Sequence, residues 1–357
     1  MKQNLLRILI ALLCVAVLLA GCTKPEPPAD STADLPSDST PAQTEANTAA
    51  PPDVDPGEPS SADDFRFAEN SDGTLTLTGY TGTESILDIP AELNRRPVSA
   101  IGESCFAGLI CLKSVHIPEG VAQVGDYAFE CCSALQKVYF PYSLRSIGDG
   151  AFSGCECLML ADLQEGLESI GRGAFLYCVS LVQLELPETL TTLGEFAFAG
   201  CNALASVRFG GDRVTALPDR LFYGCASLSR LRLPEGITSV GKRAFSGCGK
   251  LENLYFAEPL TSLGEYAFEN CSKLTSIDLT AGAIPSGLFM GCVELSWFSV
   301  ADGASRIDYG AFRNSGISDL SVPASVETIE SGAFYSMHGS LMLDEENPNY
   351  TLIDGSL

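Results

Sequence analysis

A phenylalanine recurs along most of this chain at a nearly fixed interval. Eleven copies stand 21 to 24 residues apart, and most steps are 23 residues. A period of this length is typical of solenoids, in which one repeat forms one turn and only stacked neighbours bury a core. A chain of 357 residues therefore needs no single large core, because its core grows by repetition. The recurring residues are Phe106, Phe129, Phe152, Phe175, Phe198, Phe222, Phe245, Phe268, Phe289, Phe312 and Phe334.

Each copy carries the same frame of apolar and turn residues. In one copy Leu181, Leu184 and Leu186 have the spacing LxxLxL, and Pro187 follows them. This alternation predicts a short strand, after which proline is tolerated because no further ladder N–H is needed. The preceding Ala-Phe-x-x-Cys-x-x-Leu stretch predicts one short helical turn, because its apolar residues share a side at spacings of three. The expected fold is an α/β-type repeat solenoid of mostly short parallel β-strands with short helical turns.

A cysteine follows eight of the phenylalanines at a distance of three residues. Their spacing, without paired histidines, argues against zinc. Disulfides between stacked copies would distort a regular coil, so we expect buried free thiols that pack as small apolar residues. Cys105, Cys111, Cys131 and Cys157 lie off this series, and a bridge among them stays open. The cysteine ladder consists of Cys132, Cys155, Cys178, Cys201, Cys225, Cys248, Cys271 and Cys292.

The first 22 residues have the features of a targeting segment. Lys2 and Arg7 form a positive end, and the apolar stretch 8–20 is shorter than the roughly 20 residues of a membrane span. The stretch ends in LAGC, which resembles the lipobox of bacterial lipoproteins, in which the cysteine receives lipid. The resemblance implies a signal peptide over 1–22 and a lipid anchor on Cys22, since several acyl chains hold a protein lastingly where one does not. The alternative is an ordinary secretory signal that happens to contain Cys22.

Residues 23–64 have the composition of a linker. They are rich in Pro, Ser, Thr, Ala and acidic residues, with Lys24 as one basic residue. Such a segment cannot bury enough apolar surface to fold, and proline and self-repulsion keep it extended. We expect it to hold the repeats away from the membrane. The formal net charge of −24 for the whole chain disfavours nucleic acid and anionic membrane surfaces as partners.

The frame Ile-Gly-x-x-Ala-Phe-x-x-Cys-x-x-Leu-x-x-Leu-x-Leu-Pro, as in residues 170–187, resembles the BspA-type leucine-rich repeat. The resemblance implies a leucine-rich-repeat solenoid with a β-rich N-terminal cap over 65–100 and repeats over 101–340. It further implies that residues 341–357, which include Asn347-Pro348-Asn349-Tyr350, continue into another strand, so that this C-terminal segment is cut short. BspA-like proteins are bacterial surface proteins, several of them implicated in adhesion, and they share no ligand motif that could be carried over.

The sequence predicts no catalytic site, no metal site and no cofactor. The two histidines, His116 and His338, stand far apart in the repeat series. Neither the G-x-S-x-G and H-E-x-x-H motifs nor a phosphate-binding or dinucleotide fingerprint occurs. His116 falls at an outward strand position, where a surface role is expected. Asp72-Gly73 is expected to form a turn.

The outward positions of the LxxLxL strands form a surface that we call the strand face. Arginine and aromatic residues there suggest a site for an extracellular or envelope protein or glycan, because such side chains are enriched in binding hot spots. We therefore expect a non-catalytic, lipid-anchored, extracytoplasmic recognition or adhesion protein, with Arg208, Arg230 and Arg232 clustered on adjacent strands. The alternative is an envelope spacer or scaffold that self-associates or binds envelope proteins. The candidate partner-binding residues are Tyr139, Arg208, Arg230, Arg232, Tyr255 and Trp297.

Overall fold

The computed structural model describes residues 61–350 except Thr280 and His338. All of them belong to one compact unit, Glu58–Leu357. The predicted signal segment 1–22 with Cys22, the predicted linker as far as residue 60, and residues 351–357 lie outside the described part.

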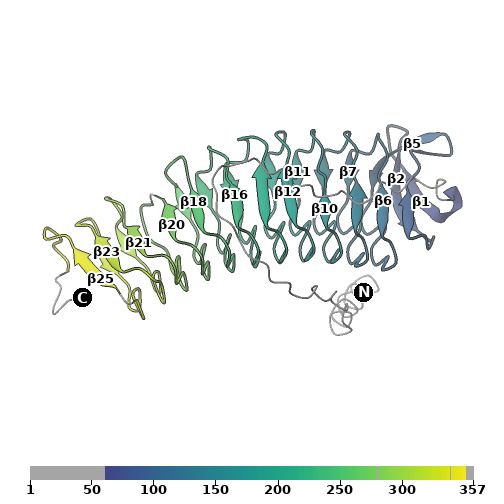
Figure 1. Ribbon diagram of the computed structural model, residues 1–357. Coiled ribbons are helices and arrows are strands. Elements are labelled where there is room, and N and C mark those ends of the chain that lie inside the picture. The colour runs from purple at the N-terminus through teal and green to yellow at the C-terminus, as the bar shows by residue number, and fades with distance from the viewer. Residues whose placement is uncertain (1–60, 280, 338, 351–357) are drawn as a thin grey trace, which may run out of the picture. The chain divides into compact units, whose positions relative to one another are not determined.

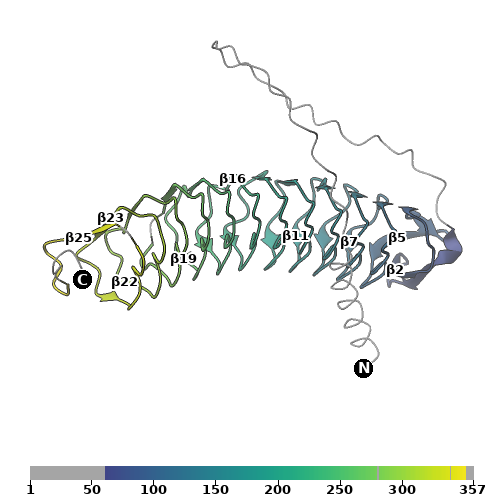
Figure 2. The ribbon, with the colours of Figure 1, turned by 60° about the horizontal axis from the view of Figure 1, so that its bottom comes forward.

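Each repeat forms one coil that contains two short strands and a turn. In one coil β11 (Ser169–Ile170) leads through the turn that holds Phe175 to β12 (Gln183–Leu186). β11 pairs with β9 and β13, and β12 pairs with β10 and β14, all in parallel. Hydrogen bonds therefore join each coil to its neighbours on two sides, and Figures 1 and 2 show the coils as a stack. The predicted solenoid of short parallel strands is confirmed.

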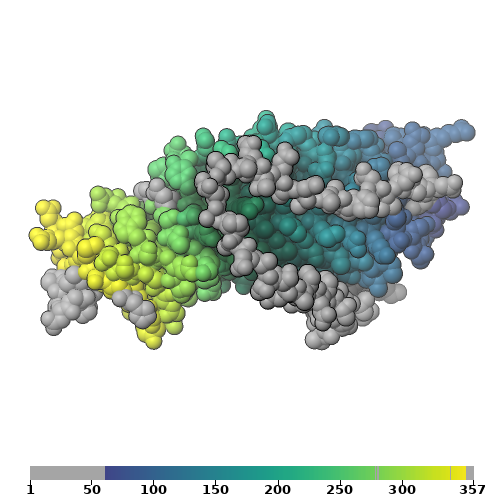
Figure 3. All heavy atoms as spheres, in the orientation of Figure 1, coloured from purple at the N-terminus to yellow at the C-terminus, as the bar shows by residue number. Residues whose placement is uncertain are grey.

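The LxxLxL segments build the sheet that carries the strand face. Seven strands lie in the order β16-β14-β12-β10-β8-β6-β3, and the pair β18-β20 and the trio β21-β23-β25 follow as separate sheets. In the space-filling view, side chains fill the gaps that the ribbons leave between coils (Figure 3). The bounds are β3 Ile86–Asp88, β6 Ser114–His116, β8 Lys137–Tyr139, β10 Leu160–Ala161, β12 Gln183–Leu186, β14 Ser206–Phe209, β16 Arg230–Arg232, β18 Asn253–Tyr255, β20 Ser276–Asp278, β21 Trp297–Ser299, β23 Asp319–Val322 and β25 Ser340–Leu343.

A second set of strands, mostly two residues long, stacks on another side of the coils. The order is β1-β2-β5-β7-β9-β11-β13 with β4 on β5, followed by β15-β17-β19 and β22-β24. This sheet is interrupted between β13 and β15, where the step between phenylalanines lengthens to 24 residues. The bounds are β1 Phe65–Glu69, β2 Leu75–Tyr80, β4 Glu92–Leu93, β5 Arg96–Ile101, β7 Gln123–Val124, β9 Ser146–Ile147, β11 Ser169–Ile170, β13 Thr192–Leu193, β15 Ala216–Leu217, β17 Ser239–Val240, β19 Ser262–Leu263, β22 Arg306–Ile307 and β24 Thr328–Ile329.

A β-hairpin covers the first coil. The short 3-10 helix η1 (Ala62–Asp64) leads into β1, which pairs with β2 in antiparallel fashion, and β2 continues in parallel onto β5. As expected, a turn joins β1 and β2: Gly73 has a φ of 86°, and the Asp72 carboxylate accepts a hydrogen bond from the Thr74 N–H at 2.9 Å. The rings of Phe65 and Tyr80 then close over Phe106, with centroids 6.5 and 5.6 Å away.

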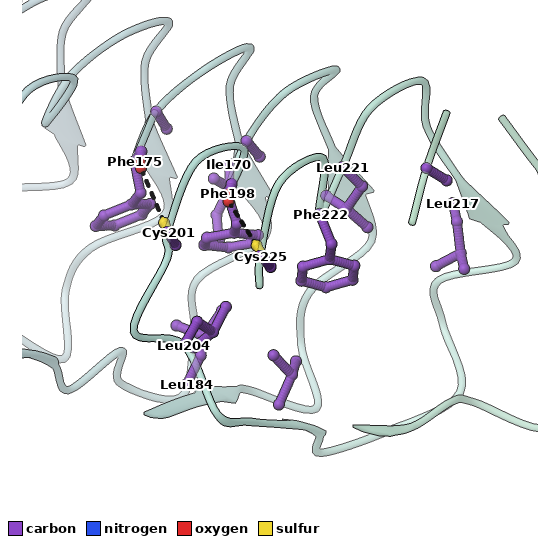
Figure 4. Close-up of a cluster of buried hydrophobic side chains, with 14 of the residues drawn as sticks. Ile170, Phe175, Leu184, Phe198, Cys201, Leu204, Leu217, Leu221, Phe222 and Cys225 are labelled. Atoms are coloured by element: carbon purple, nitrogen blue, oxygen red, sulfur yellow. Dashed lines mark hydrogen bonds between the residues drawn. The ribbon is translucent and has the colours of Figure 1, made fainter. Parts of the chain in front are cut away.

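The recurring phenylalanines form one continuous stack through the core. Ten of the eleven are fully buried, and neighbouring rings lie 4.9 to 5.9 Å apart with interplanar angles of 4° to 27°. Figure 4 shows three members, Phe175, Phe198 and Phe222, with Leu184 and Leu204 below them. Aromatic pairs at this separation contribute beyond the burial of their area. Each interior ring thus packs against two others.

The turn that holds each phenylalanine is not helical, contrary to the prediction. The residues two before and two after each phenylalanine have positive φ, for example Phe196 at 58° and Gly200 at 71° around Phe198. An α-helix cannot pass through such residues. Alternate N–H groups of the turn donate instead to carbonyl groups of the next coil. For example, the Phe198 N–H donates to the Leu221 carbonyl at 3.1 Å. The turn is therefore a third ladder between coils, built from β-turns.

Both glycines and bulky residues occupy these left-handed positions. Tyr127 and Tyr177 have φ values of 56° and 58°. Their rings lie directly over Gly150 and Gly200 of the next coil, where a Cβ atom would collide with them. The rings of Tyr127 and Tyr177 thus require glycine at these positions of the following coils.

The cysteine ladder lies beside the phenylalanine stack. All eight members are buried free thiols, and each donates its S–H to the carbonyl of the phenylalanine one coil earlier, at 3.0 to 3.3 Å. Figure 4 draws two of these bonds, from Cys201 and Cys225. The thiols therefore bridge coils by hydrogen bonds as well as filling space. Of the off-ladder cysteines, Cys105 and Cys111 are free thiols, buried and exposed respectively.

Replacing Phe198 by alanine should lower the free energy of unfolding by about 3–5 kcal/mol, the usual cost of truncating a buried phenylalanine. Phe334→Ala is the matched control, because Phe334 is partly buried and stacks on one described neighbour, Phe312. We expect a smaller loss there, measured by urea unfolding followed by circular dichroism. Equal losses at the two positions would contradict a stack whose members depend on two neighbours.

The ladder thiols should make the fold sensitive to alkali. Burial raises the pKa of Cys132, Cys201 and Cys292 to about 12, and that of the other five well above the ordinary 9.0. At a pH between the ordinary pKa of a thiol and its raised pKa in the fold, the folded protein keeps a proton that the unfolded chain has lost. The free energy of unfolding is therefore unaffected below about pH 9 and falls as the pH rises. One unit above the unfolded value, each thiol costs about 1.4 kcal/mol.

The variant Cys201→Ala tests this titration. It lacks one thiol, so alkali should destabilise it less than the wild type. The difference in free energy of unfolding between the two proteins should therefore be about 1.4 kcal/mol smaller at one pH unit above the unfolded pKa than at neutral pH. Denaturant unfolding at the two pH values measures it. A difference that does not change with pH would show that the thiol titrates alike in the folded and unfolded states.

Candidate binding site on the strand face

Alternation along the LxxLxL strands turns every second side chain outward. In β12 Leu184 and Leu186 are buried, whereas Gln183 and Glu185 are exposed. The next strand repeats the pattern, with Val207 buried and Arg208 exposed. The parallel register places equivalent residues of successive coils side by side, so outward residues form rows across the coils.

A hollow of about 550 Å³ opens on this face over β12, β14 and β16. It lies at the end of the seven-stranded sheet, where the strand order stops at β16 and β18 begins a separate sheet. Residues of the coil beyond that interruption complete its wall. The lining residues are Gln183, Leu184, Glu185, Ser206, Val207, Arg208, Ser229, Arg230, Leu231, Arg232, Glu252 and Asn253.

Three arginines give the hollow its charge. Arg208 and Arg232 are direct partners in the register of β14 and β16, and Arg230 pairs with Ser206 in the same two strands. Adjacent strands lie about 4.8 Å apart, so the backbones of Arg208 and Arg232 are held near one another. Two like charges about 4 Å apart would repel by on the order of 1 kcal/mol even in water. The predicted clustering of these arginines is confirmed.

Within the described part of the chain these guanidinium groups have no counter-ion. Across 61–350, leaving out 280 and 338, no ion pair or side-chain hydrogen bond involves Arg208, Arg230 or Arg232. Other basic residues pair with carboxylates of the next coil: Arg172 with Glu195 at 3.7 Å, Lys242 with Glu265 at 3.2 Å, and Arg243 with Glu269 at 2.9 Å.

The other predicted face residues do not line the hollow. Tyr139 is on β8, two strands beyond β12, where its ring packs edge-on against His116 and lies 4.2 Å from the Lys137 ammonium. Tyr255 and Trp297 are 66% and 63% exposed on β18 and β21, which belong to two further sheets. The strand face therefore carries a cationic centre with separate aromatic residues along it.

Two acidic residues of the hollow were missed as candidates. Glu185 is the Cα partner of Arg208 across β12 and β14, and Glu252 lines the opposite wall. The outward position of Glu185 was available from the spacing of LxxLxL. Glu252 precedes its strand, and its position depends on how the coils continue beyond the interrupted sheet.

His116 pairs with a carboxylate, as a catalytic base would. Its Nδ1 lies 3.0 Å from Asp88 Oδ1 of the preceding coil. Among the described contacts, no hydroxyl or thiol lies within hydrogen-bond distance of its other ring nitrogen, as a catalytic triad would require. The described residues also hold no cluster of three or more His, Cys, Asp or Glu side chains that could bind a metal ion.

Solved structures of bacterial repeat proteins resemble this chain. A leucine-rich repeat protein of T. pallidum is 33% identical with a TM-score of 0.53, over 54% of this chain and 91% of that one. A leucine-rich cell surface protein of Faecalibacterium prausnitzii is 24% identical with a TM-score of 0.52, over 81% and 96%. A leucine-rich repeat protein of Bacteroides ovatus is 23% identical with a TM-score of 0.50, over 78% and 88%. Because the last two proteins are less than 25% identical to this chain, their similarity shows the fold alone.

The repeats themselves identify the family. No curated protein matches the chain. The model of the BspA-type leucine-rich repeat region, which spans six copies, matches residues 88–205, 168–295 and 215–341. These matches cover most of the chain and include every coil that borders the hollow. The chain belongs to the BspA-type leucine-rich repeat family.

Proposed function

We propose that this chain is a non-catalytic recognition protein that binds an extracellular or envelope partner through the strand face. The hollow formed by Arg208, Arg230 and Arg232 is the centre of the binding surface. One observation carries the proposal: among the described residues these cations have no counter-ion, although the chain has a net charge of −24. A protein with so many carboxylates could readily neutralise them, and it does so for Arg172, Lys242 and Arg243.

The rigidity of the solenoid supports this role. Binding loses less free energy to ordering when the groups are held in place beforehand. Arg208 and Arg232 start from strands that are fixed by ladder hydrogen bonds and by the buried residues between them. Arginine is also the basic residue best suited to recognition, because its planar group offers several donors in a fixed geometry.

The proposed location is the outer side of a bacterial membrane. The LAGC sequence that ends at Cys22 supports lipid attachment, and the acidic, proline-rich residues 23–64 would serve as a spacer. The relative from Faecalibacterium prausnitzii is described as a cell surface protein. In the described part of the chain, no helix has the length and apolar character needed to cross a membrane.

Partner binding should be lost when Arg208, Arg230 and Arg232 are all changed to alanine. The full-length protein would be screened against extracellular-matrix proteins, glycans and bacterial surface extracts, and each hit measured again with the variant. Truncating charged residues at the centre of an interface typically costs about 2–5 kcal/mol, so affinity should fall by at least about thirtyfold.

The triple variant Arg172→Ala/Lys242→Ala/Arg243→Ala is the matched control. It removes the same charge from side chains that are already paired with carboxylates. It should keep most of the affinity. Equal loss in both variants would point to the net charge of the protein, and full retention in the strand-face variant would overturn the proposed site.

Changing Cys22 to serine should release the protein from the membrane. The serine hydroxyl cannot replace the thiol that receives the lipid, so a lipid-labelled precursor should mark the wild type and leave the variant unlabelled. Membrane fractionation and labelling with an alkyne fatty acid measure both effects. Cys14→Ser, within the apolar stretch, is the control and should stay labelled; an unlabelled wild type would exclude the lipid anchor.

A further inference from the structure

We infer that the hollow recognises a protein surface on which an acidic side chain stands between basic ones. The inference rests on the proposed function, since it concerns the same hollow, and it adds the chemical character of the partner. The arrangement of charges within the hollow carries it.

The centre of the hollow is suited to a carboxylate. Arg208 and Arg232 are neighbours in adjacent strands, and Arg230 projects from the same strand as Arg232. All three side chains are exposed. Guanidinium groups form short, paired hydrogen bonds to carboxylates, which are about twice as strong as bonds between neutral groups. A carboxylate placed here would also relieve the repulsion among the arginines.

The flanks of the hollow have the opposite charge. Glu185 stands beside Arg208 in the register of β12 and β14, and Glu252 lines the wall beyond β16. Both side chains are exposed, and in the described ranges neither forms an ion pair. The sequence of charges across the hollow is therefore negative, positive, negative.

This order disfavours a long polyanion such as a sulfated glycan or a nucleic acid. A chain of repeated negative charges that filled the centre would continue over Glu185 and Glu252. Glu185 lies on the strand next to Arg208 and Glu252 lines the same hollow, where screening is weak because its length is roughly 8–10 Å at physiological salt. Repulsion there would offset the attraction at the centre, and the net charge of −24 adds to it at longer range.

A protein surface can supply the complementary order. An Asp or Glu would enter between Arg208 and Arg232, while neighbouring Lys or Arg side chains would face Glu185 and Glu252. Complementary charges of this kind fix the register of an interface and exclude wrong partners. The flanking acids thus act as specificity residues, and the arginines provide the attraction.

Short peptides of defined charge test the inference on the full-length protein. Four sets of equal length would be immobilised: one with a central Glu between Lys residues, one all Glu, one all Lys and one neutral, with heparin as a separate polyanion. Three proteins would be compared, namely the wild type, Arg208→Gln/Arg232→Gln and Glu185→Gln/Glu252→Gln. All four positions are exposed, so the fold should persist, and circular dichroism verifies it.

The wild type should prefer the mixed-charge peptide to the all-Glu peptide and to heparin. The arginine variant should lose about tenfold or more of the mixed-charge binding, while binding to the all-Lys peptide stays unchanged or rises. The glutamate variant should reverse the preference, so that the all-Glu peptide and heparin bind more tightly than the mixed-charge one. This reversal is the decisive readout, because a surface that only attracts anions would not depend on the flanking acids.

Two results would overturn the inference: the wild type preferring heparin or the all-Glu peptide, or mixed-charge binding that does not depend on the arginines. Absence of binding to every probe at millimolar concentration would also overturn it. The proposed function fails separately, if the strand-face triple alanine variant keeps its affinity for an identified partner.

Discussion

The contact between successive coils is the interaction on which the structure depends. A single coil of about 23 residues has no interior of its own, so each phenylalanine is buried only because the coils before and after it exist. Three ladders of backbone hydrogen bonds and one of thiols run parallel to the ring stack. Stability is thus approximately a sum of nearly identical interfaces between neighbours.

Because the inward side chains provide the stacking, the outward side chains are not constrained by the core. The inward positions of each strand and turn are taken by Leu, Val, Phe and Cys, which the stacking fixes. The outward positions carry no such requirement, so charge and aromatic residues there can vary from coil to coil without disturbing the core. The hollow at Arg208 and Arg232 is one local result, located where the ladder on that side is interrupted.

Much of this could be predicted from the sequence because the repeat is so regular. The period predicted the solenoid, and the LxxLxL spacing predicted which side chains point outward. The step of 24 residues between Arg208 and Arg232 predicted that they lie on adjacent strands. The phenylalanine, cysteine and leucine spacings of three were misinterpreted as a helix. Spacings of three also fit successive β-turns, and the left-handed residues that decide between them include Tyr, Phe and Arg, which rarely adopt that conformation.

The hollow itself could not be predicted. Its wall depends on the end of the seven-stranded sheet at β16, and no motif marks that interruption. Tyr255, a candidate residue of the strand face, lies on β18 beyond this interruption and does not line the hollow. The thiol hydrogen bonds were missed for a different reason: cysteine was treated as an apolar filler, and the carbonyl that each S–H meets lies one coil away.

The pairing of a bulky left-handed residue with a glycine on the next coil bears on how such a protein can evolve. The rings of Tyr127 and Tyr177 occupy the space that a Cβ atom would need on Gly150 and Gly200. Neighbouring coils are therefore not freely interchangeable, despite their common frame. Gene duplication or recombination that places a coil directly after Tyr177 would be tolerated where that coil has glycine at this position and would meet the ring where it does not. The identity of one turn residue thus limits which coils can become neighbours.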